Sequence, residues 1–271
     1  MEPMRLRMSS IRSVLGDVQG NVSRILSRCD AAASDGVDLV CFPELSVTGY
    51  AMPGSRREAM ADSDPLLGAI ADKTAETGMA ACYGYVDSEG CIAQAVVEGG
   101  RLLGIYRKTH LGEREAGVMA PGNAFPVIRT SKAAVGISIC WEAHFPEIAG
   151  TYALDGADLI LMPFASGLGG ARRQSSWDRV LPARAYDNTV FVGACNAFGD
   201  TGGGAVLGGG AAVYDVRGEL MGSAEGECEV TADLDPGQMD RIRAEGYESM
   251  RDVYFLDKRR PELYGRIVER D

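Results

Sequence analysis

The sequence contains little histidine and no closely paired cysteines. His110 and His144 are its only histidines, so a mechanism that depends on a histidine base has only two candidate residues. The seven cysteines stand singly without a Cys-x-x-Cys pair, which argues against a disulfide framework and against a structural zinc site. We therefore expect reduced cysteines, most of them buried as small apolar side chains.

Long apolar runs and an excess of positive charge are also absent. No stretch approaches the roughly 20 apolar residues that span a bilayer, and residues 1–12 hold no apolar run of signal-peptide length. We expect a cytoplasmic protein that does not bind a membrane. The formal net charge of -11 disfavours nucleic acids as partners, because they attract cationic patches. Small molecules are the expected ligands.

No Gly/Ser linker or shift in composition divides the chain. In both halves, short β-branched runs alternate with segments of helical period, which is the pattern of an α/β fold with helices covering its sheets. The first half has a predicted strand at 4–11, a helix from an Asn21 cap to Gly36, and a buried strand at 38–42. A single domain over residues 1–271 with two similar sheets explains this order.

The second half repeats the pattern after a predicted strand at 134–139. Pro146 opens a helix that stops at Gly156. Residues 172–186 are predicted to form one helix, kinked at Pro182, before another strand at 190–195.

Three polar residues follow predicted strands, where open α/β sheets place their ligands. Glu44 comes directly after a buried strand, and partial desolvation there would raise its pKa toward that of a general base. Lys108 ends a strand and could stabilise an oxyanion. Taken alone, Glu44 could equally be a surface cap, and Lys108 a solvated side chain.

Cys140 lies where a predicted strand turns sharply into a helix, which is the geometry of an exposed nucleophile. The backbone N–H of Trp141 would point into the same space. A cysteine near a lysine and a helix start can have a depressed pKa. The alternative is a buried apolar cysteine, as expected for most of the seven.

Three motifs around these residues resemble those of the nitrilase superfamily of carbon–nitrogen hydrolases, in that family's order. They are Phe42-Pro43-Glu44-Leu45 with Thr48-Gly49-Tyr50, Tyr106-Arg107-Lys108-Thr109-His110-Leu111, and Ile139-Cys140-Trp141-Glu142 with Phe145-Pro146-Glu147. The likeness extends over nearly the whole chain, to Arg260-Pro261-Glu262-Leu263-Tyr264. It implies a four-layer α-β-β-α sandwich that pairs into a homodimer or larger homo-oligomer.

The resemblance also implies roles. Glu44 would be the general base, Cys140 the nucleophile that forms a thioester, and Lys108 the oxyanion-binding cation. The N–H of Trp141 would assist Lys108, and Glu142 is grouped with Trp141 as substrate-binding. No metal or organic cofactor is required.

The family carries a further glutamate after its lysine. Counting seven residues from Lys108 places it at Glu115, with Glu113 as the alternative. Here the sequence departs from the family, because Gly112-Glu113-Arg114 stands where many members have Phe followed by small residues.

The length of the chain is similar to that of the amidase and carbamoylase branches, so we expect hydrolysis of a small amide or carbamoyl compound. The alternative is a nitrilase that converts a nitrile to its acid, because Cys140-Trp141-Glu142 resembles the motif of true nitrilases. Arg172 and Arg173, in a loop expected to border the pocket, could bind a substrate carboxylate or simply be solvated.

Two other functions use the same cysteine differently. Cys140 and His144, one helical turn apart, could form a thiol–imidazole pair of a peptidase or acyltransferase. A binding protein on this scaffold is disfavoured because all three reactive positions are filled. A Cys140 that resists iodoacetamide at neutral pH would favour it.

Overall fold

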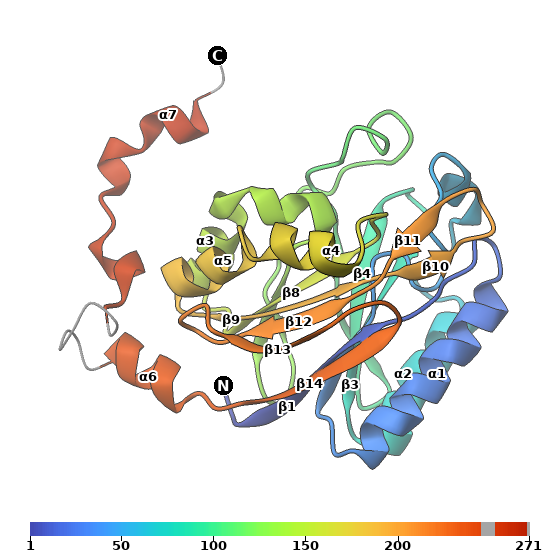
Figure 1. The fold of residues 1–271 in the computed structure, drawn as a ribbon, viewed down its shortest axis with the longest axis horizontal. Coiled ribbons are helices and arrows are strands. Elements are labelled where there is room, and N and C mark those ends of the chain that lie inside the picture. Colours follow the sequence, from blue (N-terminus) through green and yellow to red (C-terminus); the bar gives the residue numbers. More distant parts are fainter. Residues whose placement is uncertain (245–252, 270–271) are drawn as a thin grey trace.

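Two six-stranded sheets form the centre of the protein in the computed structural model, which describes residues 1–244 and 253–269 (Figure 1). The first sheet contains β1 (Met4–Ser10), β2 (Leu39–Cys41), β3 (Ala80–Val86), β4 (Ile92–Glu98), β5 (Arg101–Arg107) and β14 (Cys228–Leu234). The second contains β6 (Ile128–Arg129), β7 (Ala134–Ile137), β8 (Leu159–Phe164), β9 (Phe191–Asn196), β12 (Ala211–Tyr214) and β13 (Leu220–Ala224). A separate ribbon pairs β10 (Phe198–Asp200) with β11 (Val206–Gly208).

The two sheets have similar topologies. Their strand orders are β14-β1-β2-β3-β4-β5 and β13-β12-β9-β8-β7-β6. Each has three neighbouring parallel strands, β1-β2-β3 in one and β7-β8-β9 in the other, with antiparallel strands on both sides. Parallel strands direct their carboxyl ends to the same edge of a sheet, where ligands bind in open α/β folds.

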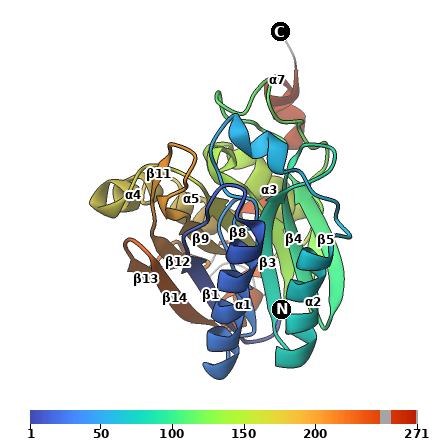
Figure 2. The same ribbon diagram turned by 90° about the vertical axis from the view of Figure 1, so that its right-hand side faces the viewer.

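Helices cover the outer face of each sheet (Figures 1 and 2). The first sheet is covered by α1 (Val18–Ser34) and α2 (Pro65–Thr77), and the second by α3 (Pro146–Leu154), α4 (Gly170–Trp177) and α5 (Leu181–Asn188). Toward the C-terminus lie α6 (Gly237–Ala244) and α7 (Gly265–Val268), and short 3₁₀ helices span Gly54–Glu58, Cys140–His144, Phe255–Lys258 and Pro261–Leu263. The predicted four-layer α-β-β-α sandwich is confirmed. Residues 245–252 and 270–271 of the predicted single domain lie outside the described residues.

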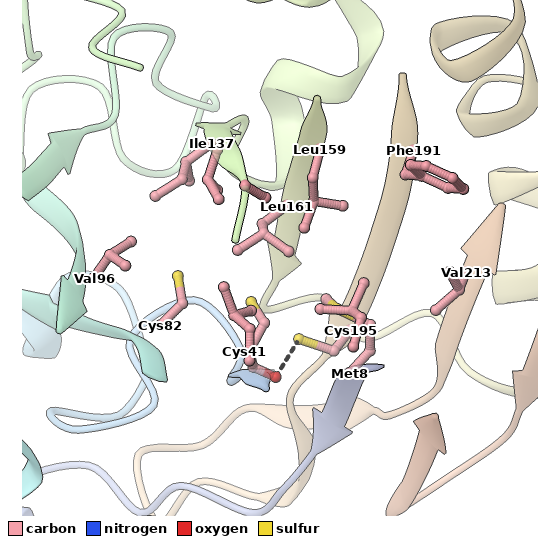
Figure 3. Close-up of a cluster of buried hydrophobic side chains, with 14 of the residues drawn as sticks. Met8, Cys41, Cys82, Val96, Ile137, Leu159, Leu161, Phe191, Cys195 and Val213 are labelled. Atoms are coloured by element: carbon pink, nitrogen blue, oxygen red, sulfur yellow. Dashed lines mark hydrogen bonds between the residues drawn. The ribbon is translucent and has the colours of Figure 1, made fainter. Parts of the chain in front are cut away.

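Each space between layers holds its own apolar cluster, because successive strand side chains point to opposite faces. Leu159 and Leu161 face the other sheet, whereas Ile160 packs with the helices. Figure 3 shows the cluster between the sheets, where Met8 and Cys195 lie close together. A Cβ on Gly193 would come within 2.7 Å of the Met8 sulfur, so a side chain at this crossing of β1 and β9 would require the Met8 side chain to move.

Two predicted local features were wrong. The cap of α1 is Asp17, which accepts the N–H of Gly20, whereas Asn21 is buried and bonds the carbonyls of Val14 and Val47. The helix predicted at 172–186 is two helices, α4 and α5. Pro182 lies in the first turn of α5, where its missing N–H breaks no helical bond.

The expectation of reduced, mostly buried cysteines is confirmed. All seven are free thiols, and only Cys140 and Cys228 are partly exposed. Among the described residues, no helix combines the length and apolarity needed to cross a lipid bilayer.

Candidate active site

Cys140 begins the 3₁₀ helix that follows β7, at the carboxyl end of a parallel strand. Its φ of 52° lies in the left-handed region, which is unfavourable for a residue with a side chain. The strained turn takes the thiol out of the sheet and into a pocket of about 570 Å³. The sharp strand–helix turn predicted for Cys140 is therefore present.

A buried lysine joins two carboxylates below this pocket. Lys108, which directly follows β5, is fully buried, and its Nζ donates to Glu44 Oε1 at 2.7 Å and to Glu115 Oε1 at 2.9 Å. Glu44 is also fully buried, just beyond β2. Glu115, rather than the exposed Glu113, is the second carboxylate against the lysine.

The cluster holds one cation between two anions, and its pKa values reflect that imbalance. Burial raises the pKa of Glu44 to about 7, with the Lys108 charge lowering it and the Glu115 charge raising it. Burial lowers the pKa of Lys108, but the negative charges of Glu44 and Glu115 outweigh burial and raise it overall. Lys108 is a permanent cation, whereas Glu44 titrates near neutrality.

Glu44 still has a free oxygen. Its Oε2 is buried and finds no hydrogen-bond partner within the described residues. Because the other oxygen accepts from Lys108, Oε2 is the one available to take up a proton.

Cys140 differs from the depressed pKa that its surroundings were expected to give. Burial raises the pKa of its thiol to about 12, and the Glu44 carboxylate raises it further, whereas Lys108 and the N–H of Ala165 lower it. The nearest anion opposes a second negative charge on sulfur. At neutral pH the thiol of Cys140 is therefore protonated.

Glu142, expected beside Trp141 in the substrate-binding group, is instead a buried structural carboxylate. Its Oε1 accepts hydrogen bonds from Tyr106 Oη at 2.6 Å, from the N–H and hydroxyl of Thr109 at 2.8 Å each, and from the N–H of His110 at 3.0 Å. Its Oε2 accepts the N–H of Ile139 at 2.7 Å. One side chain thus fixes the loop after Lys108 to the turn that carries Cys140.

Replacing Glu142 with glutamine is expected to lower the free energy of unfolding by about 1–3 kcal/mol. The amide would put an N–H₂ group against donors that now meet a carboxylate oxygen, so at least one buried donor would lose its acceptor. Urea unfolding at pH 7 measures the change. The matched control is Glu147→Gln in the first turn of α3, where the carboxylate is exposed and the substitution should be nearly neutral. Equal stabilities of the two variants would contradict the structural role.

The rest of the pocket is formed by loops from both sheets. Tyr50 lines it and donates its hydroxyl to Glu115 at 3.1 Å. Trp141 lines it with an indole that is 44% exposed. Ala165 and Ser166, directly after β8, and residues 204–207 complete the lining.

The two histidines lie outside the cluster. His144 is exposed and stacks edge-on against Trp141, and no hydrogen bond joins it to Cys140 in the described part of the chain. His110 contacts Thr109 Oγ1 at 2.8 Å and stacks on Phe145, as expected of a structural histidine. The thiol–imidazole pair is not assembled in this structure.

The arginine pair occupies α4 rather than a loop. Arg172 is exposed and does not line the Cys140 pocket. Arg173 is buried and bonds the hydroxyl of Ser166, a pocket residue that sequence reasoning missed. No sequence pattern marked Ser166, because a serine in a Gly-rich stretch is indistinguishable from a turn residue.

Comparison with known proteins gives consistent matches. A sequence profile of the carbon-nitrogen hydrolase family matches residues 5–244. A probable nitrilase of Schizosaccharomyces pombe is 28% identical over 93% of this chain and 94% of its own, and human omega-amidase NIT2 is 26% identical over 95% and 97%. A mutant of the amidase from Nesterenkonia sp. AN1, solved with butyramide, superposes with a TM-score of 0.80 at 25% identity, covering 97% of this chain and 96% of its own.

Proposed function

Because this chain belongs to the carbon-nitrogen hydrolase family, we propose that it hydrolyses the carbon–nitrogen bond of a small, non-peptide amide or carbamoyl compound. The observation that carries the proposal is the buried Glu44–Lys108–Glu115 cluster beneath a pocket-lining cysteine. It supplies a nucleophile, a base that titrates near pH 7 and a fixed cation. These are the groups that acyl transfer from nitrogen to water requires.

The first half of the reaction forms a thioester. Glu44 takes the proton of Cys140 as sulfur attacks the carbonyl carbon, and the C=O electron pair moves onto oxygen. Lys108 Nζ and the N–H of Trp141 hold that oxyanion. When the intermediate collapses, the C–N bond breaks and Glu44 returns its proton to nitrogen, so that ammonia or an amine leaves.

The second half restores the enzyme. Glu44 takes a proton from water, whose oxygen attacks the thioester carbon. The C–S bond then breaks, the proton passes to sulfur, and the acid is released with Cys140 again a thiol. Glu115 holds Lys108 and, through it, keeps the cation aimed at the oxyanion.

We propose amides rather than nitriles as the substrates, although this chain is similar both to a probable nitrilase and to an omega-amidase. The glutamate after Cys140-Trp141, which resembles the motif of true nitrilases, faces the Lys108 loop and not the pocket. It therefore gives no support to a nitrile. The butyramide complex of the amidase from Nesterenkonia sp. AN1 favours a small amide.

The test is to incubate the protein with short amides, carbamoyl compounds and nitriles, and to measure ammonia release together with the mass of Cys140 peptides. We expect ammonia from amides and a transient acyl adduct on Cys140. Ammonia from nitriles alone would establish the alternative activity. Release of ammonia without an adduct in rapid-quench samples would contradict the thioester route.

The dependence of kcat/KM on pH follows from the base. Glu44 must be ionised to take a proton, and its pKa is raised to about 7, so kcat/KM should fall roughly tenfold per pH unit below that value and level off above it. Glu115→Gln should move the midpoint to lower pH, because the Glu115 charge raises the pKa of Glu44. A flat profile between pH 5 and 8 would show that Glu44 is not the base.

A further inference from the structure

A buried glutamine lies in the apolar space between the two sheets. Gln94 on β4 is fully buried, and strand side chains two positions apart face the same side of a sheet. Its neighbours on that face, Ile92 and Val96, belong to the apolar cluster between the sheets. The Oε1 atom of Gln94 has no hydrogen-bond partner among the described residues. Because a half-satisfied amide in an apolar layer is unfavourable, packing alone does not explain a glutamine here.

The amide nitrogen of Gln94 takes part in an interruption of the first sheet. Phe42 still follows the parallel pairing of β2 with β3, because its N–H donates to the Cys82 carbonyl at 2.8 Å. The next bond of a parallel pair would join the Gly84 N–H to the Phe42 carbonyl. Instead, the Gly84 N–H donates to Ser46 Oγ at 3.0 Å. The Phe42 carbonyl accepts Gln94 Nε2, also at 3.0 Å. Two side chains therefore replace one ladder bond where the chain leaves the sheet.

Gly84 leaves room for both the glutamine and the departing chain. It pairs with Gln94 across β3 and β4, and a Cβ on Gly84 would lie 2.6 Å from Gln94 Oε1. The same Cβ would lie 2.5 Å from the backbone nitrogen of Leu45. Leu45 has a φ of 52°, in the left-handed region that is unfavourable for a residue with a side chain. The strained segment that carries Glu44 thus rests directly on the strand at Gly84, with Gln94 against it.

Gln94 also connects the segments that carry the base and the cation. Its main chain pairs with Tyr106 on β5, two residues before Lys108. Its side chain holds the carbonyl of Phe42, two residues before Glu44. The two sides of the Glu44–Lys108 contact, which is 2.7 Å long, are therefore both anchored to this one residue.

We propose that Gln94 is a positioning residue that holds Glu44 in place for proton transfer from Cys140. It acts through the Phe42 carbonyl and makes no contact with the substrate. Ser46 supports the same turn through the other replacement bond. This inference rests on the proposed role of Glu44 as the base of amide hydrolysis.

Gln94→Met tests this role, because it removes the hydrogen-bond donor and keeps a side chain of similar length. A displacement of about 1 Å at a reacting group can lower a rate by about 10²-fold, so we expect kcat for a short amide to fall by about 10- to 100-fold. KM should stay within about threefold of the parent value, because the groups that bind the substrate are unchanged. Steady-state ammonia assays at pH 8 measure both constants.

The pH dependence of kcat/KM distinguishes positioning from a general loss of stability. The charges that bear on Glu44 are those of Lys108, Glu115 and Cys140, and the Lys108 charge lowers the pKa of Glu44. A looser contact with Lys108 weakens that effect, so the midpoint for Gln94→Met should lie above the parent value of about 7. A midpoint at or below that of the parent would contradict the proposal.

The matched control is Thr74→Val, near the far end of β4 where the chain turns into β5. Thr74 is also fully buried, and its Oγ1 accepts the N–H of Gly100 at 3.2 Å. Like Gln94→Met, this variant deprives one backbone group of its partner, so melting temperatures should fall by similar amounts. The control should keep the parent kcat and midpoint. Equal losses of kcat in the two variants would show that destabilisation alone is responsible. If Gln94→Met does not fold, Ser46→Ala takes its place with the same expectations.

Alkylation of Cys140 separates this inference from the proposed function. Iodoacetamide reacts with the thiolate, so the reaction requires transfer of the proton to Glu44 but no amide substrate. We expect the rate at pH 7 to fall about tenfold in Gln94→Met and to stay unchanged in Thr74→Val. If the parent hydrolyses no amide but shows this difference, amide hydrolysis fails and the positioning role stands. Equal alkylation rates in the parent and Gln94→Met would overturn the role, whether or not amides are hydrolysed.

Discussion

Replacing Cys140 with alanine is expected to reduce ammonia release from a short amide by at least about 10⁴-fold. The proposed reaction passes through a covalent bond to sulfur, and no other described cysteine, serine or threonine has a side chain placed on the Glu44–Lys108 cluster. The residual rate would reflect binding and the oxyanion site alone. Ammonia assays at pH 8, where Glu44 is ionised, measure the loss.

Cys228→Ala is the matched control for this variant. Cys228 is the other partly exposed thiol, and it lies on β14 outside the pocket. Its removal should leave the rate and the acyl adduct unchanged. A Cys140→Ala enzyme that works at the parent rate would refute the proposed nucleophile.

Replacing Lys108 with methionine should affect both the reaction and the fold. The oxyanion would lose its cation, which is expected to lower kcat by about 10²- to 10³-fold. Glu44 and Glu115 would then face each other in a buried site without a cation between them. Breaking a buried ion pair from one side destabilises a protein by about 3–5 kcal/mol, which urea unfolding at pH 7 would detect.

The pH dependence of that destabilisation has a definite sign. Without Lys108, burial and the Glu115 charge raise the pKa of Glu44 further, so its protonated form stabilises the folded state. The deficit of Lys108→Met relative to the parent should therefore be smaller at pH 5 than at pH 8.

The double variant Lys108→Met with Glu115→Gln separates structure from chemistry. It removes one negative charge with the positive one, so stability should largely return while activity does not. Return of activity in the double variant would mean that Lys108 serves only to neutralise Glu115.

The candidate catalytic residues Glu44, Lys108 and Cys140 could be located from sequence because each follows an apolar run that is typical of a strand. Glu44 and Cys140 lie shortly after the ends of the parallel strands β2 and β7. Parallel strands bring the residues that follow them to the same edge of a sheet. Glu115 was found only by counting along a resembling motif. Its partner Tyr50 is 65 positions away, a contact that no local pattern encodes.

The predictions for Asn21 and Glu142 that the structure contradicts share a physical cause. Asn21 and Glu142 are residue types that usually cap helices or face solvent, so composition places them at the surface. Both are buried because their side chains satisfy backbone donors and acceptors of segments distant in sequence. The Arg172–Arg173 pair was expected in a loop but lies in α4. There Arg172 is exposed to solvent, whereas Arg173 is buried and bonds the hydroxyl of Ser166.

The carboxylate of Glu142 also bears on how such a site can be inherited. Its donors come from the loop after β5 in the first sheet, while Glu142 itself stands beside Cys140 in the second. The halves of the chain, though alike in topology, are therefore not interchangeable modules. Consider a chimera with residues 1–125 from one relative and the remainder from another. It would keep the spacing between Lys108 and Cys140 only if both relatives had the same hydrogen-bond partners for the side chain at position 142.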